Sequence, residues 1–180
     1  MRSFVAIEIS DVNVVNSIKK FQSEINIKAS PVNPNNFHFT LQFLGEISEE
    51  LTQKIILALR TIKFSRFVVN LKGVGSFPRA KSPRIIWIGT DENGGNKLIQ
   101  LSKKIEKLLE PLGLFSDKSF KPHITVFRIK KKTDDITKEL ENKNTVNFGM
   151  QEITSIKLKK SELTPNGPIY SDIVEIMAVK

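Results

Sequence analysis

The two histidines of this chain each begin the same four-residue pattern: histidine, an apolar residue, threonine and a second apolar residue. The two copies are His38-Phe39-Thr40-Leu41 and His123-Ile124-Thr125-Val126. In an extended strand, side chains alternate between the two faces. Each copy therefore predicts a half-buried strand that places histidine and threonine on one face and two apolar side chains in a core.

The repeated pattern also indicates a chemistry. If the two strands face one another, two imidazoles and two hydroxyls converge on one spot. Histidine titrates near neutral pH, so one ring can be protonated while the other is neutral. Such a pair can move protons to and from the oxygens of a phosphate ester. The alternative is that both histidines are ordinary strand residues, each followed by a threonine because threonine favours strands.

Composition limits the class of protein. With 180 residues, of which 39% are hydrophobic, the chain can bury a core, and we expect residues 1–180 to form one two-lobed domain. No segment approaches the roughly 20 apolar residues of a membrane span, and the first residues do not form a secretory signal. The chain has no cysteine, and two histidines alone make a poor metal site. We therefore expect a cytoplasmic protein without a bound metal or membrane contact.

The charge of the chain favours a polyanionic partner. The 28 lysines and arginines exceed the 19 acidic residues, giving a net charge of +9. This excess points above all to nucleic acid, although lysine-rich surfaces also serve solubility. Residues 73–84 contain Arg79, Lys81 and Arg84 among glycines and prolines. They form either a basic rim beside a phosphate site or a solvated connection between strands.

The remaining periodicities predict an α+β fold. Strands are expected at residues 3–9, 37–44, 64–71, 85–88, from 122 onward, 153–163 and 169–179. Helices are expected from a cap at Ser10, from Ser48, after residues 93–95 and, as a short helix, within 134–140. Each half of the chain holds one motif strand preceded by a helix, which indicates a pseudo-twofold arrangement.

The two motifs and their flanks resemble the two-histidine phosphodiesterase superfamily. Residues 33–46 (NPNNFHFTLQFLGE) and 120–126 (FKPHITV) are similar to its RNA 2',3'-cyclic phosphodiesterase branch, first named 2'-5' RNA ligase. Four shorter segments also fit that branch: residues 4–7, 83–87, 161–163 and 167–170. The resemblance implies a bilobed fold in which two antiparallel sheets, with helices on their outer faces, line a V-shaped cleft.

The resemblance also implies a reaction. Members of this branch open an RNA 2',3'-cyclic phosphate to a 2'-phosphomonoester without a cofactor, and some reversibly join tRNA halves through a 2'-5' linkage. Carried over, His38 would be the proton donor to the departing 3'-oxygen and His123 the proton acceptor from water. By microscopic reversibility, these two roles exchange when the reaction runs in reverse. Thr40 and Thr125 would donate hydrogen bonds to the non-bridging phosphate oxygens, where charge builds in the transition state.

Arg128 is a further candidate for contacting the phosphate, because the family often has arginine three places after the second threonine. Strict alternation places Arg128 on the face opposite His123, so it reaches the site only if the strand bulges or twists. At residues 30–32 (SPV) the chain departs from the family, where many members carry a basic residue and tryptophan. This departure bears on nucleoside contacts and not on the phosphate chemistry.

The leading hypothesis is thus a monomeric RNA cyclic phosphodiesterase whose partner is RNA with 2',3'-cyclic phosphate ends. A first alternative is a non-catalytic module that keeps the fold and binds nucleotide or RNA; two titratable imidazoles argue against it. A second alternative is a general basic RNA-binding protein with incidental histidines. That class uses aromatic stacking platforms, whereas most aromatic residues here lie in apolar runs.

Overall fold

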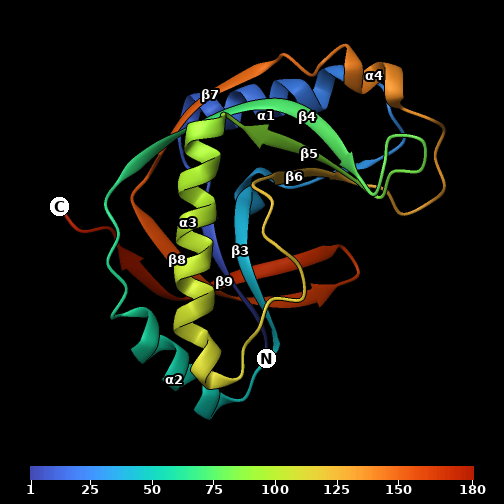
Figure 1. Cartoon of the computed structure of the whole chain (residues 1–180). Coiled ribbons are helices and arrows are strands. Elements are labelled where there is room, and N and C mark those ends of the chain that lie inside the picture. Colours follow the sequence, from blue (N-terminus) through green and yellow to red (C-terminus); the bar gives the residue numbers. More distant parts are fainter.

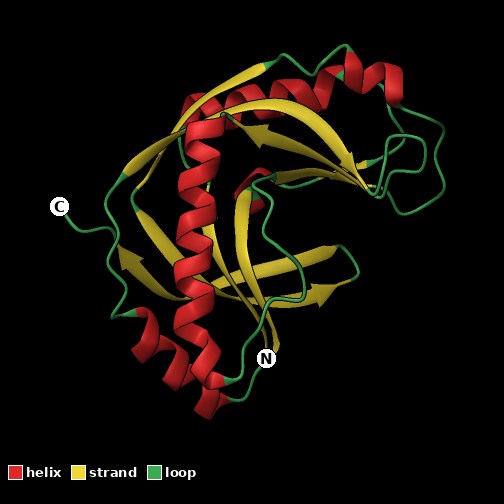
Figure 2. Cartoon of the chain, in the orientation of Figure 1, coloured by secondary structure: helices red, strands yellow, loops and turns green.

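The computed structural model describes residues 1–180, and it is an α+β structure (Figures 1 and 2). The strands are β1 (Arg2–Glu8), β2 (Ser30–Pro31), β3 (His38–Glu46), β4 (Phe67–Phe77), β5 (Ile85–Thr90), β6 (Ile124–Arg128), β7 (Asn147–Ile153), β8 (Ser155–Thr164) and β9 (Gly167–Met177). The helices are α1 (Val12–Glu24), α2 (Glu49–Leu59), α3 (Glu92–Leu109) and α4 (Thr137–Glu141), with 3-10 turns at Pro34–Asn36 and Glu110–Leu112. The predicted fold class is confirmed.

The strands form one antiparallel order, β7-β4-β5-β6-β3-β1-β8-β9, and β2 pairs with β6 outside this order. The two motif strands, β3 and β6, are neighbours at the centre and are joined by a single residue pair, Phe39 with Ile124. The two expected sheets are therefore two four-stranded halves that meet at this pair. In Figure 1 the halves diverge from the centre as two arms, one ending at the β4–β5 connection and the other at the β8–β9 hairpin.

The helices bury one face of each half in a common core. The core contains 33 buried apolar side chains. Helix α1 packs against β6 and β7, while α3 contacts both β3 and β4 and so spans the two halves. Its stripe of Leu98, Leu101 and Ile105 is fully or almost fully buried, as the helical spacing predicts. No helix is both long and apolar enough to cross a membrane.

The helix starts differ from the prediction at two places. Helix α1 is capped by Asp11, whose carboxylate accepts from the Val14 backbone N–H, whereas the Ser10 backbone N–H donates to the Gln151 side chain. Helix α3 begins before the glycines rather than after them, because Asp91 caps it by accepting from the Gly94 backbone N–H. A side chain at Gly94 would come within 2.9 Å of the β4 backbone at Val69, so glycine permits this close contact. The predicted start of α2 at Ser48 is confirmed.

Sequence reasoning was wrong about one strand length and missed β7 altogether. Strand β4 does not end near residue 71; it continues to Phe77 and pairs with β5 along its outer part. Residues 73–84 were expected to form a basic rim or a solvated connection between strands, but Gly75 lies within the strand, directly opposite Trp87, and a Cβ there would be 2.2 Å from the indole ring. Glycine inside a strand here marks the close approach of a large side chain. Strand β7 pairs with β4 at the edge of the order; it contains a glycine and gave no clear signal.

Candidate active site

The site is organised around the residue pair that joins the two halves. Because Phe39 lies opposite Ile124 in an antiparallel pair, the register brings His38 opposite Thr125 and Thr40 opposite His123. Phe39 and Ile124 are fully buried, whereas the two histidines and two threonines are only partly buried. The four predicted residues therefore lie on one side of the sheet, which we call the motif face.

Both motif strands carry a bulge at the same position. In β3, Thr40 and Gln42 pair with the consecutive residues Ala6 and Val5 of β1, so Leu41 is an extra residue. In β6, Thr125 and Phe127 pair with consecutive residues of β5, so Val126 is the extra residue. A bulge of this kind reverses the alternation that follows it. The duplication thus extends from the sequence motif to the backbone.

The bulge in β6 places Arg128 on the motif face. Val126 and Phe127 are both buried, and Arg128, which strict alternation would put in the core, is exposed. Its positive charge lies close enough to His38 to contribute to lowering the pKa of that ring. The successive apolar pair Val126-Phe127 was the sequence signal for this bulge. At the equivalent position of β3 stands Phe43, which is 70% exposed, so only one half offers a cation there.

Both histidines are oriented by the same local contact. The Nδ1 atom of His38 lies 2.6 Å from the backbone carbonyl of Asn36, and Nδ1 of His123 lies 2.6 Å from that of Lys121. A carbonyl oxygen only accepts, so Nδ1 carries the proton and donates in each case. In the neutral ring the Nε2 atom is then the unprotonated nitrogen. The backbone two residues earlier therefore selects the same tautomer in both copies.

The two threonines differ in their contacts. The Thr40 hydroxyl lies 2.9 Å from Nε2 of His38, and it donates to that nitrogen when the ring is neutral. Neither Nε2 of His123 nor the Thr125 hydroxyl has a hydrogen-bond partner within the protein. His123 thus presents a free basic nitrogen on the motif face, whereas the basic nitrogen of His38 is held by its own motif threonine.

Aromatic rings surround each histidine. The His38 ring lies 5.2 Å from Phe4 and 5.4 Å from Tyr170, measured between centroids. The His123 ring lies 5.1 Å from Phe77, and Trp87 is 6.4 Å away. Trp87 also lines an adjoining hollow of about 440 Å³. Sequence reasoning noted only that most aromatic residues lie in apolar runs, and it missed that several of them surround the two imidazoles.

This partial burial lowers the pKa of both rings. Burial lowers the pKa of His38 to about 4; the Asn36 carbonyl opposes the shift and the positive charge of Lys159 adds to it. Burial also lowers the pKa of His123, again opposed by its backbone carbonyl. Removing water from an imidazole disfavours its charged form. Both rings therefore favour the neutral form in the free protein at pH 7, and a nearby anion would shift each of them toward the charged form.

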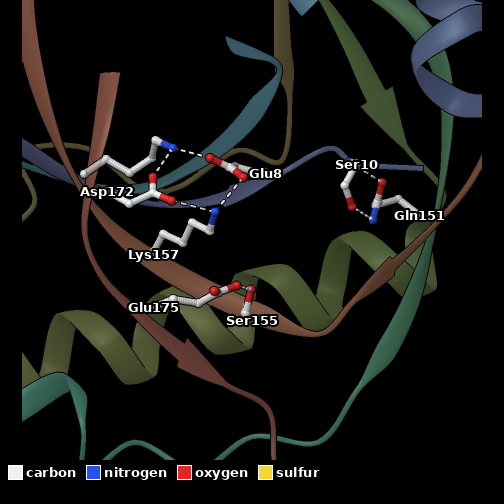
Figure 3. Close-up of polar contacts among 8 residues, drawn as sticks. Glu8, Ser10, Gln151, Ser155, Lys157, Asp172 and Glu175 are labelled. Carbon is white, nitrogen blue, oxygen red and sulfur yellow. Dashed lines mark hydrogen bonds and ion pairs between the residues drawn. The ribbon is translucent and has the colours of Figure 1, made fainter. Parts of the chain in front are cut away.

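Four charged side chains form a cluster, shown in Figure 3, on the strands next to the first motif. Lys157 donates to Glu8 at 2.8 Å and to Asp172 at 2.7 Å, and Lys159 pairs with the same two carboxylates. Glu8 is directly opposite His38 in the β1–β3 register. Burial raises the pKa of Glu8, but the hydrogen bonds from the two lysines outweigh it, so the net pKa is lowered. The cluster ties β1, β8 and β9 together next to the first motif.

The cluster was not predicted. A strand was predicted at residues 153–163, and β8 confirms it. Lys159, however, is 5% exposed, because it lies between two carboxylates contributed by other strands. A lysine is almost never this buried without a charged partner. The partner strands are distant in sequence, so spacing alone gave no signal.

Comparison with known proteins places this geometry in a class. The crystal structure of TT0787 of Thermus thermophilus matches with a TM-score of 0.77 and 29% identity, covering 98% of this chain and 97% of that one. The crystal structure of Escherichia coli LigT complexed with 3'-AMP matches with a TM-score of 0.79 and 23% identity, covering 99% and 98%. The fold is therefore that of LigT-like proteins.

The family follows from the sequence. Residues 2–176 match the family model described as the AKAP7 2'5' RNA ligase-like domain, and the chain belongs to this family. A protein of Archaeoglobus fulgidus named RNA 2',3'-cyclic phosphodiesterase is 38% identical over 177 residues, which cover 96% of this chain and 98% of that protein. A protein of the same name from Methanocaldococcus jannaschii is 39% identical over 184 residues, covering 97% and 99%.

Proposed function

We propose that this protein hydrolyses the 2',3'-cyclic phosphate ends of RNA to 2'-phosphomonoesters by acid–base catalysis with His38 and His123. The observation that carries the proposal is the central strand pair, which sets the two histidine–threonine pairs opposite one another on the motif face. Matching backbone contacts give both rings the same tautomer, so the two Nε2 atoms are the ones left to exchange protons. The names of the relatives from Archaeoglobus and Methanocaldococcus support the same activity.

The reaction assigns one proton transfer to each ring. His123 takes a proton from water through Nε2, which no protein group occupies, and the resulting hydroxide attacks phosphorus. His38, once protonated, gives its Nε2 proton to the 3'-oxygen as the bond from phosphorus to that oxygen breaks. The phosphate anion favours the charged form of His38. With a ribose 5'-hydroxyl in place of water, the same step forms a 2'-5' linkage: His123 takes the hydroxyl proton and His38 protonates the departing 3'-oxygen. The two groups exchange roles when that linkage is broken back to the cyclic phosphate. We propose tRNA halves as the substrates for this joining.

Two neutral hydrogen-bond donors and one cation stabilise the negative charge of the transition state. The Thr125 hydroxyl is free to donate to a non-bridging oxygen, and Thr40 becomes free once its contact with His38 is released. Arg128, brought onto the motif face by the bulge, adds a positive charge. Phe43 at the equivalent place in β3 cannot do so, which makes the proposed phosphate site asymmetric. We propose that neither a metal nor a cofactor takes part.

We further propose that residues 1–180 act as one two-lobed domain, as a monomer in the cytoplasm. The core and the antiparallel strand order run through both halves, and α3 packs on both, which supports a single domain. The proposed binding cleft for the RNA end lies between the two arms, over the motif face.

The direct test is to incubate the protein in excess EDTA with an RNA that ends in a 2',3'-cyclic phosphate and to identify the product. We expect a 2'-phosphate end and a rate that does not depend on added metal. A 3'-phosphate product would show that His38 does not serve the 3'-oxygen. Loss of activity in EDTA with rescue by Mg²⁺ would overturn the metal-free mechanism. Binding of the RNA without turnover would favour the alternative of a non-catalytic module.

A further inference from the structure

Two connections at the end of one arm form a single basic surface. One connection is residues 78–84, between β4 and β5, and the other is residues 128–136, at the end of β6 and before α4. The Ile129 backbone N–H donates to the Arg84 carbonyl at 2.9 Å, and that of Ile136 donates to the Ala80 carbonyl at 3.1 Å. The two connections are therefore held side by side, and Figure 1 shows them together at the tip of the arm.

This surface, which we call the basic rim, is rich in unpaired positive charge. Its cations, seven of the 28 in the chain, are Arg79, Lys81, Arg84, Arg128, Lys130, Lys131 and Lys132. All seven are exposed, and none of them forms a salt bridge. Its only acidic residues are Asp134 and Asp135. Lysines on the other arm contrast with this, since Lys157 and Lys159 are both neutralised by carboxylates.

The basic rim is continuous with the candidate active site. Strand β6 begins next to His123 and runs to Arg128, where the rim starts, a distance of about 16 Å for five residues of extended chain. Arg128 belongs to both regions, because it lies on the motif face and its charge reaches His38. A chain whose end sits between the two histidines would therefore meet the rim only after its terminal nucleotide.

We propose that the basic rim binds the phosphodiester backbone of the RNA strand on the 5' side of the cyclic phosphate end. The inference rests on the proposed function and extends it, because it makes a polymeric RNA strand the preferred substrate over a single cyclic nucleotide. Lysine and arginine contacts to phosphates release counterions, so the binding is salt-dependent and independent of base sequence. The rim provides the side chains that such binding uses.

The test compares two triple variants that remove equal charge. The rim variant carries Lys81→Gln, Lys130→Gln and Lys131→Gln, and the control carries Lys97→Gln, Lys103→Gln and Lys107→Gln on the exposed face of α3. For both, kcat/KM is measured over a range of salt concentrations. The substrates are a 2',3'-cyclic mononucleotide and a short single-stranded RNA with the same terminal nucleotide.

For the RNA, we expect the rim variant to lose about 10- to 100-fold in kcat/KM at low salt and to reduce its salt slope by up to about 2, at roughly 0.7 per lost phosphate contact. The mononucleotide, too short to reach the rim, should be turned over unchanged by both variants. The control should behave as the wild type with both substrates. Equal losses in rim and control variants, or no loss on RNA in the rim variant, would overturn the proposal.

Failure of the proposed function gives a different pattern from failure of the rim. If the wild type turns over neither substrate, the same comparison is made by direct binding, with an RNA carrying a 2'-phosphate end as the probe. Weaker and less salt-dependent binding by the rim variant alone would then support the rim without the catalysis. Equal binding by the wild type and the rim variant would reject it.

Discussion

At the scale of single residues, the two copies of the motif share their backbone contacts but differ in how their threonines are used. The Thr40 hydroxyl contacts Nε2 of His38, while the Thr125 hydroxyl is free. Both threonines are expected to donate to the phosphate in the transition state, but in the free protein only Thr40 has to give up a contact with its own histidine to do so. This difference also gives the two histidines unequal settings, which an acid–base pair requires.

The threonines should both contribute to turnover. Thr40→Val and Thr125→Val keep the side-chain shape and remove a hydroxyl donor, which costs about 1–3 kcal/mol of transition-state binding. We expect kcat with a cyclic phosphate substrate to fall by roughly 5- to 150-fold in each variant, measured by steady-state kinetics. Thr40→Ser and Thr125→Ser keep the hydroxyl and serve as controls. Wild-type kinetics in both valine variants would show that the hydroxyls do not contact the phosphate.

The partly buried setting of His38 makes its titration informative. Its pKa of about 4 in the folded protein lies below the value near 6.5 of an unfolded chain. The unfolded state therefore binds more protons between these values, so His38 reduces stability as pH falls from about 6.5 to about 4 and has no effect above. Relative to a His38→Gln variant, the wild type should lose free energy of unfolding across that window, as denaturant titrations would show.

The same ring should respond to a bound anion. In NMR titrations the imidazole of His38 should change near pH 4 in the free protein and at a higher pH when inorganic phosphate is present. A pKa that stays near 4 with phosphate bound would mean that His38 is not beside the anion. It would then be unable to act as the proton donor near neutral pH.

At the scale of elements, we expect the pairing of β5 with the outer part of β4 to determine the position of Trp87, one of the aromatic rings around His123. Gly75→Ala would put a Cβ 2.2 Å from the Trp87 ring, so the ring has to move. Overpacking of this kind costs about 1–3 kcal/mol of unfolding free energy. Trp87 is the only tryptophan, so its fluorescence should change in the same variant.

Ser76→Ala is the matched control for this glycine, because it alters the neighbouring strand residue without adding an atom beside the indole. It should leave both the unfolding free energy and the fluorescence close to those of the wild type. An unchanged midpoint and spectrum in Gly75→Ala would contradict the close contact between β4 and Trp87.

Most helices and strands could be predicted from the sequence, whereas part of the candidate site could not. Strand and helix periods were clear where one face is apolar, as in β3 and α3, and the motif strands were assigned from four residues each. The site was harder, because Arg128 depends on one extra residue in β6 and Lys159 on carboxylates from two other strands. A bulge changes the period that pattern analysis assumes, and a buried ion pair joins residues far apart in the chain.

At the scale of the whole molecule, the two halves repeat one design with different side chains. Each half contributes a histidine, a threonine and a bulge to the centre. One half then continues with aromatic residues such as Phe43 and Tyr170, and the other with Arg128 and the basic rim. The pseudo-twofold symmetry thus accounts for the proposed proton-transfer pair. Because the basic rim lies on one half only, the proposed RNA strand can cross the site in one direction.

The central claim is that two histidines, one from each half, act together in one reaction, and a double-mutant cycle tests it most directly. Turnover of an RNA with a 2',3'-cyclic phosphate end is measured for the wild type, His38→Ala, His123→Ala and the double variant. Circular dichroism and thermal unfolding confirm that each remains folded. We expect each single variant to lose roughly a hundredfold or more, and the double variant to lose little beyond the worse single variant, as groups acting in one unit do. Two active single variants, or losses that simply multiply in the double variant, would contradict a shared acid–base step.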